Sequence, residues 1–273
     1  MRARLRRLGL GLRTLFGPKP GGFFIPHRYA ASARPRDYPA LRPLFQAAEP
    51  RMRDLIAGIE DHAADLLRIR DGDGPARFDQ DWFPRLDAAA AYALVRRERP
   101  ARIVEIGSGH STRFLARAVA DGGLDTLITC IDPSPRASLA RLAVRHEARL
   151  LDDTDRPLFP ELAARDILFI DSSHVAMPGT DVDRLFLDVL PRLASGVLIH
   201  VYDVFLPEGY PLGWTWRGYN EQLVVGALLA GGGYEVVFAS SYVLRVSLMS
   251  AEHVVERLPE SGVPDGSLWL RKL

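Results

Sequence analysis

The sequence predicts an α/β fold in which helices cover both faces of a doubly wound, mostly parallel sheet. From residue 101 onward, short apolar segments alternate with amphipathic ones, as in a chain of β–α units. Residues 167–170 show no polar alternation, which is typical of a strand buried on both faces. The chain has 273 residues, 47% hydrophobic and 25% charged, enough for one main domain with additional elements at one end.

The N-terminal third divides at its glycine and proline residues. We expect residues 1–22 to form a basic, flexible arm, because Gly11 and the Pro/Gly-rich stretch 17–22 argue against one long helix. Residues 23–80 are predicted to be a helical extension. It starts with an apolar segment at 23–26 and continues with apolar residues at helical spacing from 41 to 70.

The main domain is expected over residues 81–273, starting with an Ala-rich helix at 87–97 that ends before Pro100. Strands are predicted at 102–106, 127–131, 149–151, 167–170, 197–202, 234–239 and 267–270, the last of them antiparallel. Helices are predicted at 112–120, 136–147, 180–193, 220–230 and near 251–258.

Cys130 is the single cysteine, so neither an intrachain disulfide nor a cysteine zinc cage can form. It lies in the apolar run 127–131, where a small buried hydrophobic side chain is expected. The absence of disulfides fits a reducing compartment, and we expect a cytoplasmic protein.

Charge is unevenly distributed along the chain. Residues 1–36 carry nine cations and no acid, which leaves the remainder acidic and unlike a nucleic-acid-binding protein. The arm lacks the unbroken apolar stretch of a signal peptide or membrane span. Three alternatives stay open for residues 1–24: a solvated terminus, a helix on an anionic membrane surface, or a segment packed on a partner subunit.

The residues that follow the first two strands predict a nucleotide-type site. Gly107 and Gly109 allow a tight turn before a helix N-terminus, and Asp132 follows the second strand, where a carboxylate can accept hydrogen bonds from ribose hydroxyls. A dinucleotide fingerprint requires a third glycine where Thr112 stands. Glu105 instead suits a cofactor that carries a cationic amino-acid group.

These strand-end residues resemble the class I S-adenosylmethionine-dependent methyltransferases, which have a Rossmann-like fold. The shared pattern comprises Val104-Glu105-Ile106-Gly107-Ser108-Gly109, Asp132 and Asp171. A smaller methyltransferase group is more similar still, through Ile170-Asp171-Ser172-Ser173-His174, His200-x-x-Asp203 and Asn220-Glu221-Gln222. The resemblance covers residues 80 to 242, and Tyr202 replaces a second histidine of that group.

The resemblance implies a role for each matching residue. The methionine part of S-adenosylmethionine would contact Glu105, Gly107, Ser108 and Gly109, with Ser111 and Asp171 also at the cofactor. Asp132 would bind the ribose. Asp152 or Asp153 would face the adenine, unless these two residues only form a solvated acidic turn.

Transfer of a methyl group to a hydroxyl requires alignment and removal of a proton. Asp171, His174 and Asp203 are the candidate catalytic residues, whereas His200 lies within a buried strand and is expected to be structural. Asp171 and Asp203 could instead hold Mg²⁺, but no acid pair follows the fifth strand, so a metal is not favoured.

The segment 205–219 is rich in aromatic residues, Pro and Gly, and we expect an acceptor pocket or lid there, with a core-packing loop as the alternative. Arg217 would then bind an acidic acceptor or form a surface ion pair. The favoured function is S-adenosylmethionine-dependent O-methylation of a small-molecule or sugar hydroxyl. The alternatives are an NAD(P)-dependent oxidoreductase and a non-catalytic cofactor-binding module.

Overall fold

A seven-stranded sheet forms the centre of the computed structural model, which describes residues 2–19, 21–22 and 27–273. The predicted apolar segment 23–26 lies outside the described residues. The strands are β1 (Arg102–Ile106), β2 (Leu127–Ile131), β3 (Arg145–Glu147), β4 (Ile167–Ile170), β5 (Leu198–Val201), β6 (Tyr234–Ala239) and β7 (Leu268–Lys272). Their order is β3-β2-β1-β4-β5-β7-β6.

The sheet is parallel from β3 to β5, and β7 is antiparallel to both of its neighbours. The predicted doubly wound fold with an antiparallel last strand is therefore confirmed. The last strand enters between β5 and β6, so Trp269 lies opposite His200 on one side and Phe238 on the other. Since β1 and β4 are central, the strand order reverses between them, and ligands bind at such a point.

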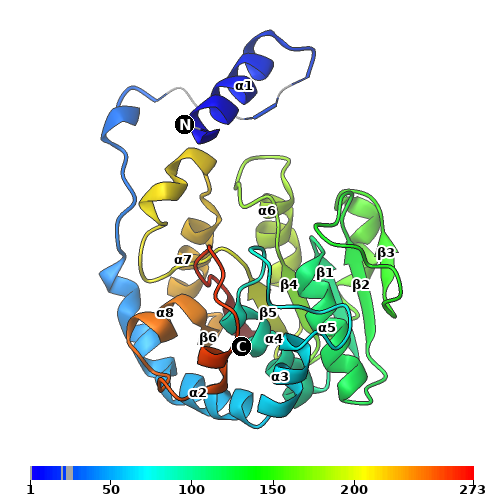
Figure 1. Ribbon diagram of the computed structural model, residues 1–273. Coiled ribbons are helices and arrows are strands. Elements are labelled where there is room, and N and C mark those ends of the chain that lie inside the picture. The colour runs from blue at the N-terminus through cyan, green and yellow to red at the C-terminus, as the bar shows by residue number, and fades with distance from the viewer. Residues whose placement is uncertain (1, 20, 23–26) are drawn as a thin grey trace.

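Helices precede and connect the strands, as Figure 1 shows. They are α1 (Arg2–Phe16), α2 (Arg42–Glu60), α3 (Ala63–Arg70), α4 (Arg85–Glu98), α5 (His110–Asp121), α6 (Asp181–Arg184), α7 (Glu221–Ala230) and α8 (Ser240–Arg245). α4 packs against α2 and α5, and α2 also packs against β6. The predicted helices at 87–97, 112–120 and 220–230 are confirmed, whereas α8 was not predicted.

Two predicted elements between β2 and β4 are wrong. Residues 136–147 form turns and then β3 instead of a helix, and 149–151 is not a strand. Arg136 N donates a hydrogen bond to Ser108 O at 3.0 Å, and a side chain on Gly109 would meet the Cβ of Arg136 at 2.9 Å. The chain is thus held against the glycine turn after β1, and this tertiary contact overrides the helical spacing of its apolar residues.

Other predicted helices are divided or shorter. The helical region 41–70 breaks between α2 and α3 at Asp61 and His62, and 180–193 is α6 followed by π and 3₁₀ turns. Near 251–258 only a 3₁₀ turn, Val254–Arg257, is present.

The arm contains the helix α1, which continues through Gly11 and ends before Gly17, so Gly11 is not one of the breaks that we predicted in the arm. A side chain on Gly9 or Gly11 would meet no atom within 4 Å, which shows that both face open space along α1. The helix ends where Gly17 N donates to Arg13 O, at the start of the Pro/Gly-rich stretch. Figure 1 shows α1 apart from the body, above the 3₁₀ segment Leu212–Arg217 (η6), which it contacts. The flexibility of residues 1–22 stays a prediction.

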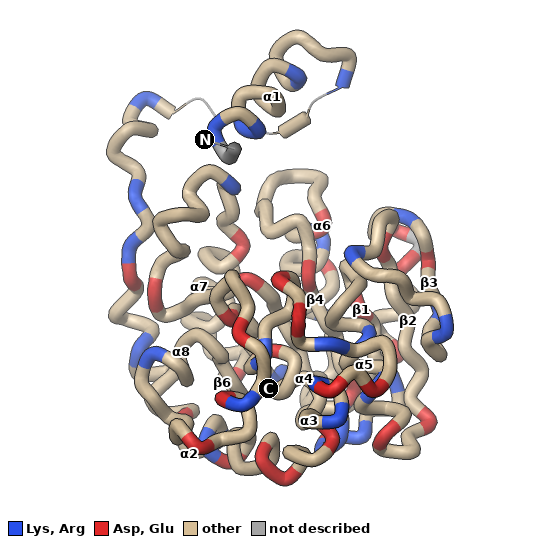
Figure 2. Tube along the Cα trace, viewed as in Figure 1, with Lys and Arg blue, Asp and Glu red and all other residues tan. Residues whose placement is uncertain are grey.

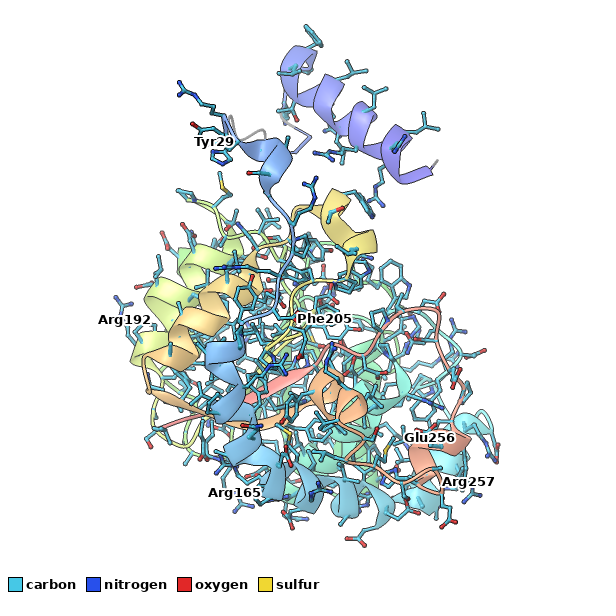
Figure 3. All side chains as sticks on the ribbon, turned by 90° about the vertical axis from the view of Figure 1, so that its left-hand side faces the viewer. Tyr29, Arg165, Arg192, Phe205, Glu256 and Arg257 are labelled. Atoms are coloured by element: carbon cyan, nitrogen blue, oxygen red, sulfur yellow. The ribbon has the colours of Figure 1, made fainter. Side chains whose placement is uncertain are left out.

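Aromatic side chains of neighbouring strands pack on one another below the carboxyl edge of the sheet. The rings of Phe169 and His200 stack with centroids 3.7 Å apart, and Trp269 lies 4.7 Å from His200. His200 is fully buried and its Nε2 is 2.8 Å from Ser267 Oγ, which confirms the structural interpretation of this histidine. Cys130 is buried, as predicted. Figure 3 shows Phe205 among the interior side chains, with Arg165 and Arg192 at the outer surface.

None of the helices in the described part of the chain combines the length and the apolarity needed to cross a bilayer.

Candidate active site

A cleft of about 670 Å³ opens at the carboxyl ends of β1, β2, β4 and β5. Small-molecule sites commonly have volumes of about 300–1,000 Å³. The structure brings seven of the predicted site residues together in its lining, namely Gly107, Ser108, Ser111, Asp132, Asp171, His174 and Asp203. Glu105, Gly109, Asp152 and Asp153 are not part of this lining.

The turn after β1 packs closely against two other segments of the backbone, at Asp171 and at Arg136. Gly107 has φ +81°, and a side chain there would meet the carbonyl oxygen of Asp171 at 2.1 Å. Gly109 has φ +152° and lies against Arg136. Only glycine suits both positions, because each combines a left-handed conformation with a close approach. The two glycines therefore shape the floor of the cleft where α5 begins.

Asp132 orders the same turn from the end of β2. Its Oδ2 accepts hydrogen bonds from Ser108 N at 2.6 Å and Ser108 Oγ at 3.1 Å, and Oδ1 accepts one from Ser134 N at 2.7 Å. The side chain is half-buried at the cleft wall. A carboxylate held in this way remains able to accept further hydrogen bonds from a ligand hydroxyl.

Glu105 is buried beneath the turn. Its oxygens accept hydrogen bonds from Ser111 Oγ and Thr112 Oγ1, both at 2.6 Å, and from Cys130 Sγ at 3.3 Å. Burial raises the pKa of Glu105 to about 7, against the opposing effect of these hydrogen bonds. The contact of Glu105 with a cofactor ammonium group stays a prediction, and the observed role is to tie α5 to β1 and β2.

This buried carboxyl makes stability depend on pH. Between pH 4.5 and about 7 the folded protein keeps a proton that the unfolded chain releases, so raising the pH favours unfolding. Relative to Glu105→Gln, the wild type is expected to lose about 3 kcal/mol of unfolding free energy over this range. Urea unfolding of both proteins at several pH values measures the difference, with Glu252→Gln as an exposed control. A difference that does not change with pH would contradict the prediction.

Asp152 and Asp153 lie on an exposed turn beyond the cleft lining. Asp152 Oδ1 is 3.5 Å from Arg149 Nη1, and Asp153 Oδ1 is 3.4 Å from Arg184 Nη1. Leu150 and Leu151, just before them, line the cleft instead. The assignment of either acid to an adenine stays a prediction, and the geometry favours the acidic-turn alternative.

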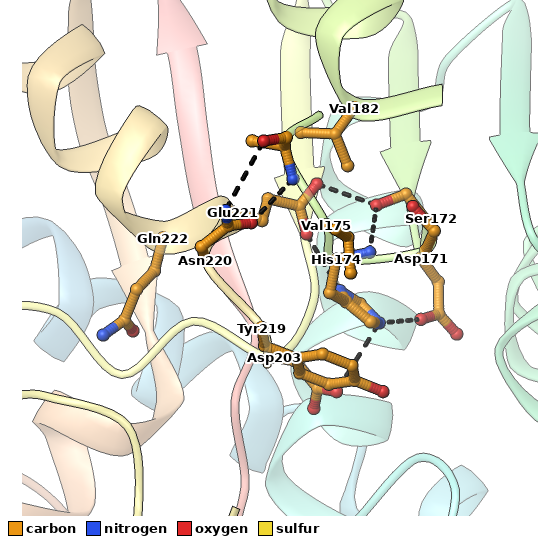
Figure 4. A network of polar contacts seen from close by, with 12 residues as sticks. Asp171, Ser172, His174, Val175, Val182, Asp203, Tyr219, Asn220, Glu221 and Gln222 are labelled. Atoms are coloured by element: carbon orange, nitrogen blue, oxygen red, sulfur yellow. Dashed lines mark hydrogen bonds and ion pairs between the residues drawn. The ribbon is translucent and has the colours of Figure 1, made fainter. Parts of the chain in front are cut away.

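Three carboxylates surround His174 at the opposite side of the cleft (Figure 4). Its Nδ1 is 2.8 Å from Glu221 Oε2, and its Nε2 is 3.3 Å from Asp171 Oδ1 and 3.5 Å from Asp203 Oδ2. The ring also packs on Tyr219, with centroids 4.6 Å apart. His174 and Asp203 have φ of +59° and +55°, a conformation that non-glycine residues adopt rarely and that gathers at functional sites.

The arrangement stabilises a positive charge on the imidazole. Burial alone would lower the pKa of His174, but hydrogen bonds to Asp171 and Glu221 and the charges of Glu221 and Asp203 raise it well above its ordinary value. Burial raises the pKa of Asp203 to about 6, while the charges of His174 and Arg217 oppose this shift. His174 is therefore an imidazolium near neutral pH, beside a carboxylate that titrates in the same region.

Glu221 was missed as a functional residue, although its triplet was recognised as part of a motif. It is buried at the first position of α7, where its Oε1 accepts a hydrogen bond from Ser172 Oγ at 2.8 Å. The backbone N–H groups of Asn220 and Glu221 both donate to His174 O. The start of α7 thus fixes the His174 loop. A glutamate at a helix start has the ordinary explanation of favourable interaction with the helix dipole, so its sequence position alone did not indicate this role.

An aromatic wall faces the histidine cluster. Trp214, Arg217 and Tyr219 line the cleft, and the Arg217 guanidinium lies 4.0 Å from the Trp214 ring centroid. Arg217 Nη1 is 3.8 Å from Asp203 Oδ2. Arg136 and Trp82 also line the cleft, and the Arg136 guanidinium lies 4.6 Å from the centroid of the Trp82 ring. This pair was not predicted. The predicted acceptor-pocket segment therefore borders the cleft through its C-terminal part, whereas Phe205 is buried.

The residues do not form a recognisable cation site. Among the residues that the structure describes, no group of three or more His, Cys, Asp or Glu side chains is arranged to hold a metal ion. The Nε2 of His174 stands between the two carboxylates, 3.3 Å from Asp171 Oδ1 and 3.5 Å from Asp203 Oδ2.

A family model described as a methyltransferase domain matches residues 104–204, from β1 to just beyond Asp203. No curated protein matches the chain. Similar solved structures include the SAH-bound methyltransferase PaMTH1 from Podospora anserina, with 17% identity, a TM-score of 0.41, and coverage of 92% of this chain and 99% of that chain. The O-methyltransferase from Bacillus cereus in complex with SAH has 17% identity and a TM-score of 0.43, covering 78% and 91%. TomG from Streptomyces achromogenes, an O-methyltransferase involved in tomaymycin synthesis and solved with SAM, has 20% identity and a TM-score of 0.41, covering 78% and 89%.

The family match spans the strands whose ends build the cleft, and the observed strand order is that of the fold which the strand-end motifs predict. Residues 104–204, which include most of β1 and all of β2, β4 and β5, therefore match a methyltransferase domain.

Proposed function

We propose that this protein transfers the methyl group of S-adenosylmethionine to a hydroxyl oxygen of a small molecule. S-adenosylmethionine supplies a methyl group that its sulfonium already activates, so the protein has to align the reactants and remove one proton. The observation that carries the proposal is the position of Asp203, a carboxylate on the cleft wall that is paired with the buried His174.

The β1–β2 side of the cleft fits the cofactor. Asp132 would bind the ribose hydroxyls, and the backbone around Gly107 and Ser108 would contact the methionine part. The alternative of an NAD(P)-dependent oxidoreductase fits less well. Thr112 stands in place of a third glycine. Its hydroxyl accepts a hydrogen bond from Gly109 N and donates one to Glu105, so side chains occupy the start of α5, where a dinucleotide site has glycine.

The β4–β5 side fits the acceptor. Above pH about 6 Asp203 is ionised and can accept the hydroxyl proton as methyl transfer proceeds. His174 positions this carboxylate with its Nε2, while Glu221 holds the other ring nitrogen. Asp171 completes the pocket around the imidazolium. We assign His174 and Glu221 as positioning residues and Asp203 as the proton acceptor.

Mg²⁺ does not fit this donor set. Hard cations require several oxygen ligands, and Asp171 and Asp203 both face the imidazolium of His174 instead of an open position between them. The reaction proposed here uses no metal ion.

The acceptor is proposed to be a small molecule, and the protein to be cytoplasmic without a nucleic-acid partner. The chain beyond residue 36 is acidic, which disfavours contact with phosphate backbones. Residues 1–24 are proposed to contact either a membrane or a second subunit.

The function can be tested with a panel of phenols, hydroxy acids and sugars incubated with S-adenosylmethionine. We expect formation of S-adenosylhomocysteine together with an acceptor that has gained one methyl group on oxygen. Calorimetry separates the alternatives, since heat of binding with NAD⁺ and none with S-adenosylmethionine would overturn the proposal. Tight S-adenosylmethionine binding with no transfer to any acceptor class would favour a non-catalytic binding module.

Replacing Asp132 with alanine is expected to weaken binding of S-adenosylhomocysteine by about 1–3 kcal/mol, because ribose hydroxyls would lose a charged acceptor. Isothermal titration calorimetry measures the change. Asp125→Ala, an exposed position before the other end of β2, serves as the matched control. Unchanged affinity in Asp132→Ala would remove this residue from the cofactor site.

A further inference from the structure

One face of α1 is apolar and uncovered. At about 100° per residue, Leu5, Leu8, Leu12, Leu15 and Phe16 fall on an arc of about 100° around the helix axis. Each of these side chains is between 49% and 82% exposed. Exposed leucines at this spacing on a single helix face mark an interaction surface, since isolated surface leucines are not aligned in this way.

The opposite side of α1 is already occupied by the protein. The returning chain packs there, since Thr14 Oγ1 donates to Gly22 O at 3.0 Å and accepts from Gly21 N at 3.1 Å. The Arg6 guanidinium lies 5.7 Å from the ring centroid of Trp216 in η6. Figures 1 and 3, seen from directions 90° apart, both show α1 lying over η6 and away from the sheet. These contacts turn the apolar face outward.

The charges of α1 indicate which kind of partner its apolar face binds. The helix contains no acid, and Arg4, Arg7 and Arg13 lie beside the apolar arc or behind it. Figure 2 shows basic residues and no acidic ones along α1, in contrast to the mixed charges of the body. An anionic lipid surface complements both features, because arginines reach headgroup phosphates while leucines enter the acyl boundary. A second copy of α1 packed on the same face would bring arginines together with no acid on either helix.

We propose that α1 binds an anionic membrane surface through its leucine face. The same helix contacts η6, whose Trp214 and Arg217 line the cleft. Membrane binding therefore holds the aromatic wall of the cleft beside the lipid surface, where a methyl acceptor with an apolar tail would be concentrated. This surface was one of three alternatives for the arm, and the helical structure and its outward leucines favour it.

Vesicle co-sedimentation of the full chain tests the proposal. We expect binding to phosphatidylglycerol/phosphatidylcholine vesicles, little binding to phosphatidylcholine alone, and weaker binding as salt is added. The double variant Leu8→Asp/Leu12→Asp should reduce binding more than roughly tenfold. The matched control, Leu127→Asp/Leu187→Asp, introduces the same charges at exposed leucines of the body and should bind as the wild type does.

Circular dichroism and affinity for S-adenosylhomocysteine should be the same in both double variants, so that failure of this proposal and failure of the proposed function are distinguishable. No vesicle binding by the wild type would overturn the membrane proposal. So would equal loss of binding in the two double variants. Light scattering that shows a dimer in the wild type and a monomer only in Leu8→Asp/Leu12→Asp, without vesicle binding, would assign the face to a second copy instead.

Discussion

Replacing Asp203 with asparagine is expected to lower kcat for methyl transfer by roughly 10²–10⁴-fold, the usual contribution of a general base. The amide keeps the size of the side chain but cannot accept the hydroxyl proton. Binding of S-adenosylhomocysteine should change little, because Asp203 lies at the acceptor side of the cleft while Asp132 lies at the end of β2. The loss should therefore be confined to the chemical step.

The pH profile adds a second measurement for Asp203. In the wild type, kcat/KM should rise with pH through about 6, where the carboxyl loses its proton, and this rise should be absent from the residual activity of Asp203→Asn. Asp125→Asn, at an exposed position outside the cleft, is the matched control. An Asp203→Asn enzyme with the activity of the wild type would exclude this residue as the proton acceptor.

Replacing His174 with alanine is expected to lower the free energy of unfolding by about 3–5 kcal/mol, because Glu221 would remain buried without its cationic partner. The effect depends on pH. Since the folded protein raises the pKa of His174, the stabilisation is fully present below pH 6.5 and is lost as the pH rises through the folded value. The stability difference between wild type and His174→Ala should shrink accordingly at high pH.

A double-mutant cycle isolates this pair from the rest of the cluster. Glu221→Gln removes the buried charge, so the double variant His174→Ala/Glu221→Gln should be more stable than the sum of the two single losses predicts. Urea unfolding of the four proteins near neutral pH gives the coupling free energy. Additive losses would show that Glu221 and His174 do not stabilise one another.

The position of the cleft was predictable from the strand-end motifs, because parallel strands bring their carboxyl ends together at one edge of the sheet. The apolar runs located β1, β2, β4, β5 and β6, and the residues following four of them formed the cleft. The segments between β2 and β4, which include the edge strand β3, were not predictable in this way. The path from β2 to β3 depends on the contact of Arg136 with Gly109, which joins residues 27 positions apart.

The chemistry of individual side chains depended on contacts that the sequence does not encode locally. Glu105 was predicted to meet a cofactor, yet its carboxylate accepts three hydrogen bonds from within the protein. His174 was a candidate base, and the structure places three carboxylates around its buried ring, which raise its pKa. Neither environment follows from spacing along the chain.

The sequence by itself determined the fold class and which strand ends border the cleft, because strand periodicity and the glycines and acids after each strand are local features with one common geometry. Only the tertiary structure decided which carboxylates gather around His174, and that the leucines of α1 face outward. A pKa and an exposed face both depend on what packs against a side chain, and for Asp203, His174 and α1 the packing partners come from distant parts of the chain.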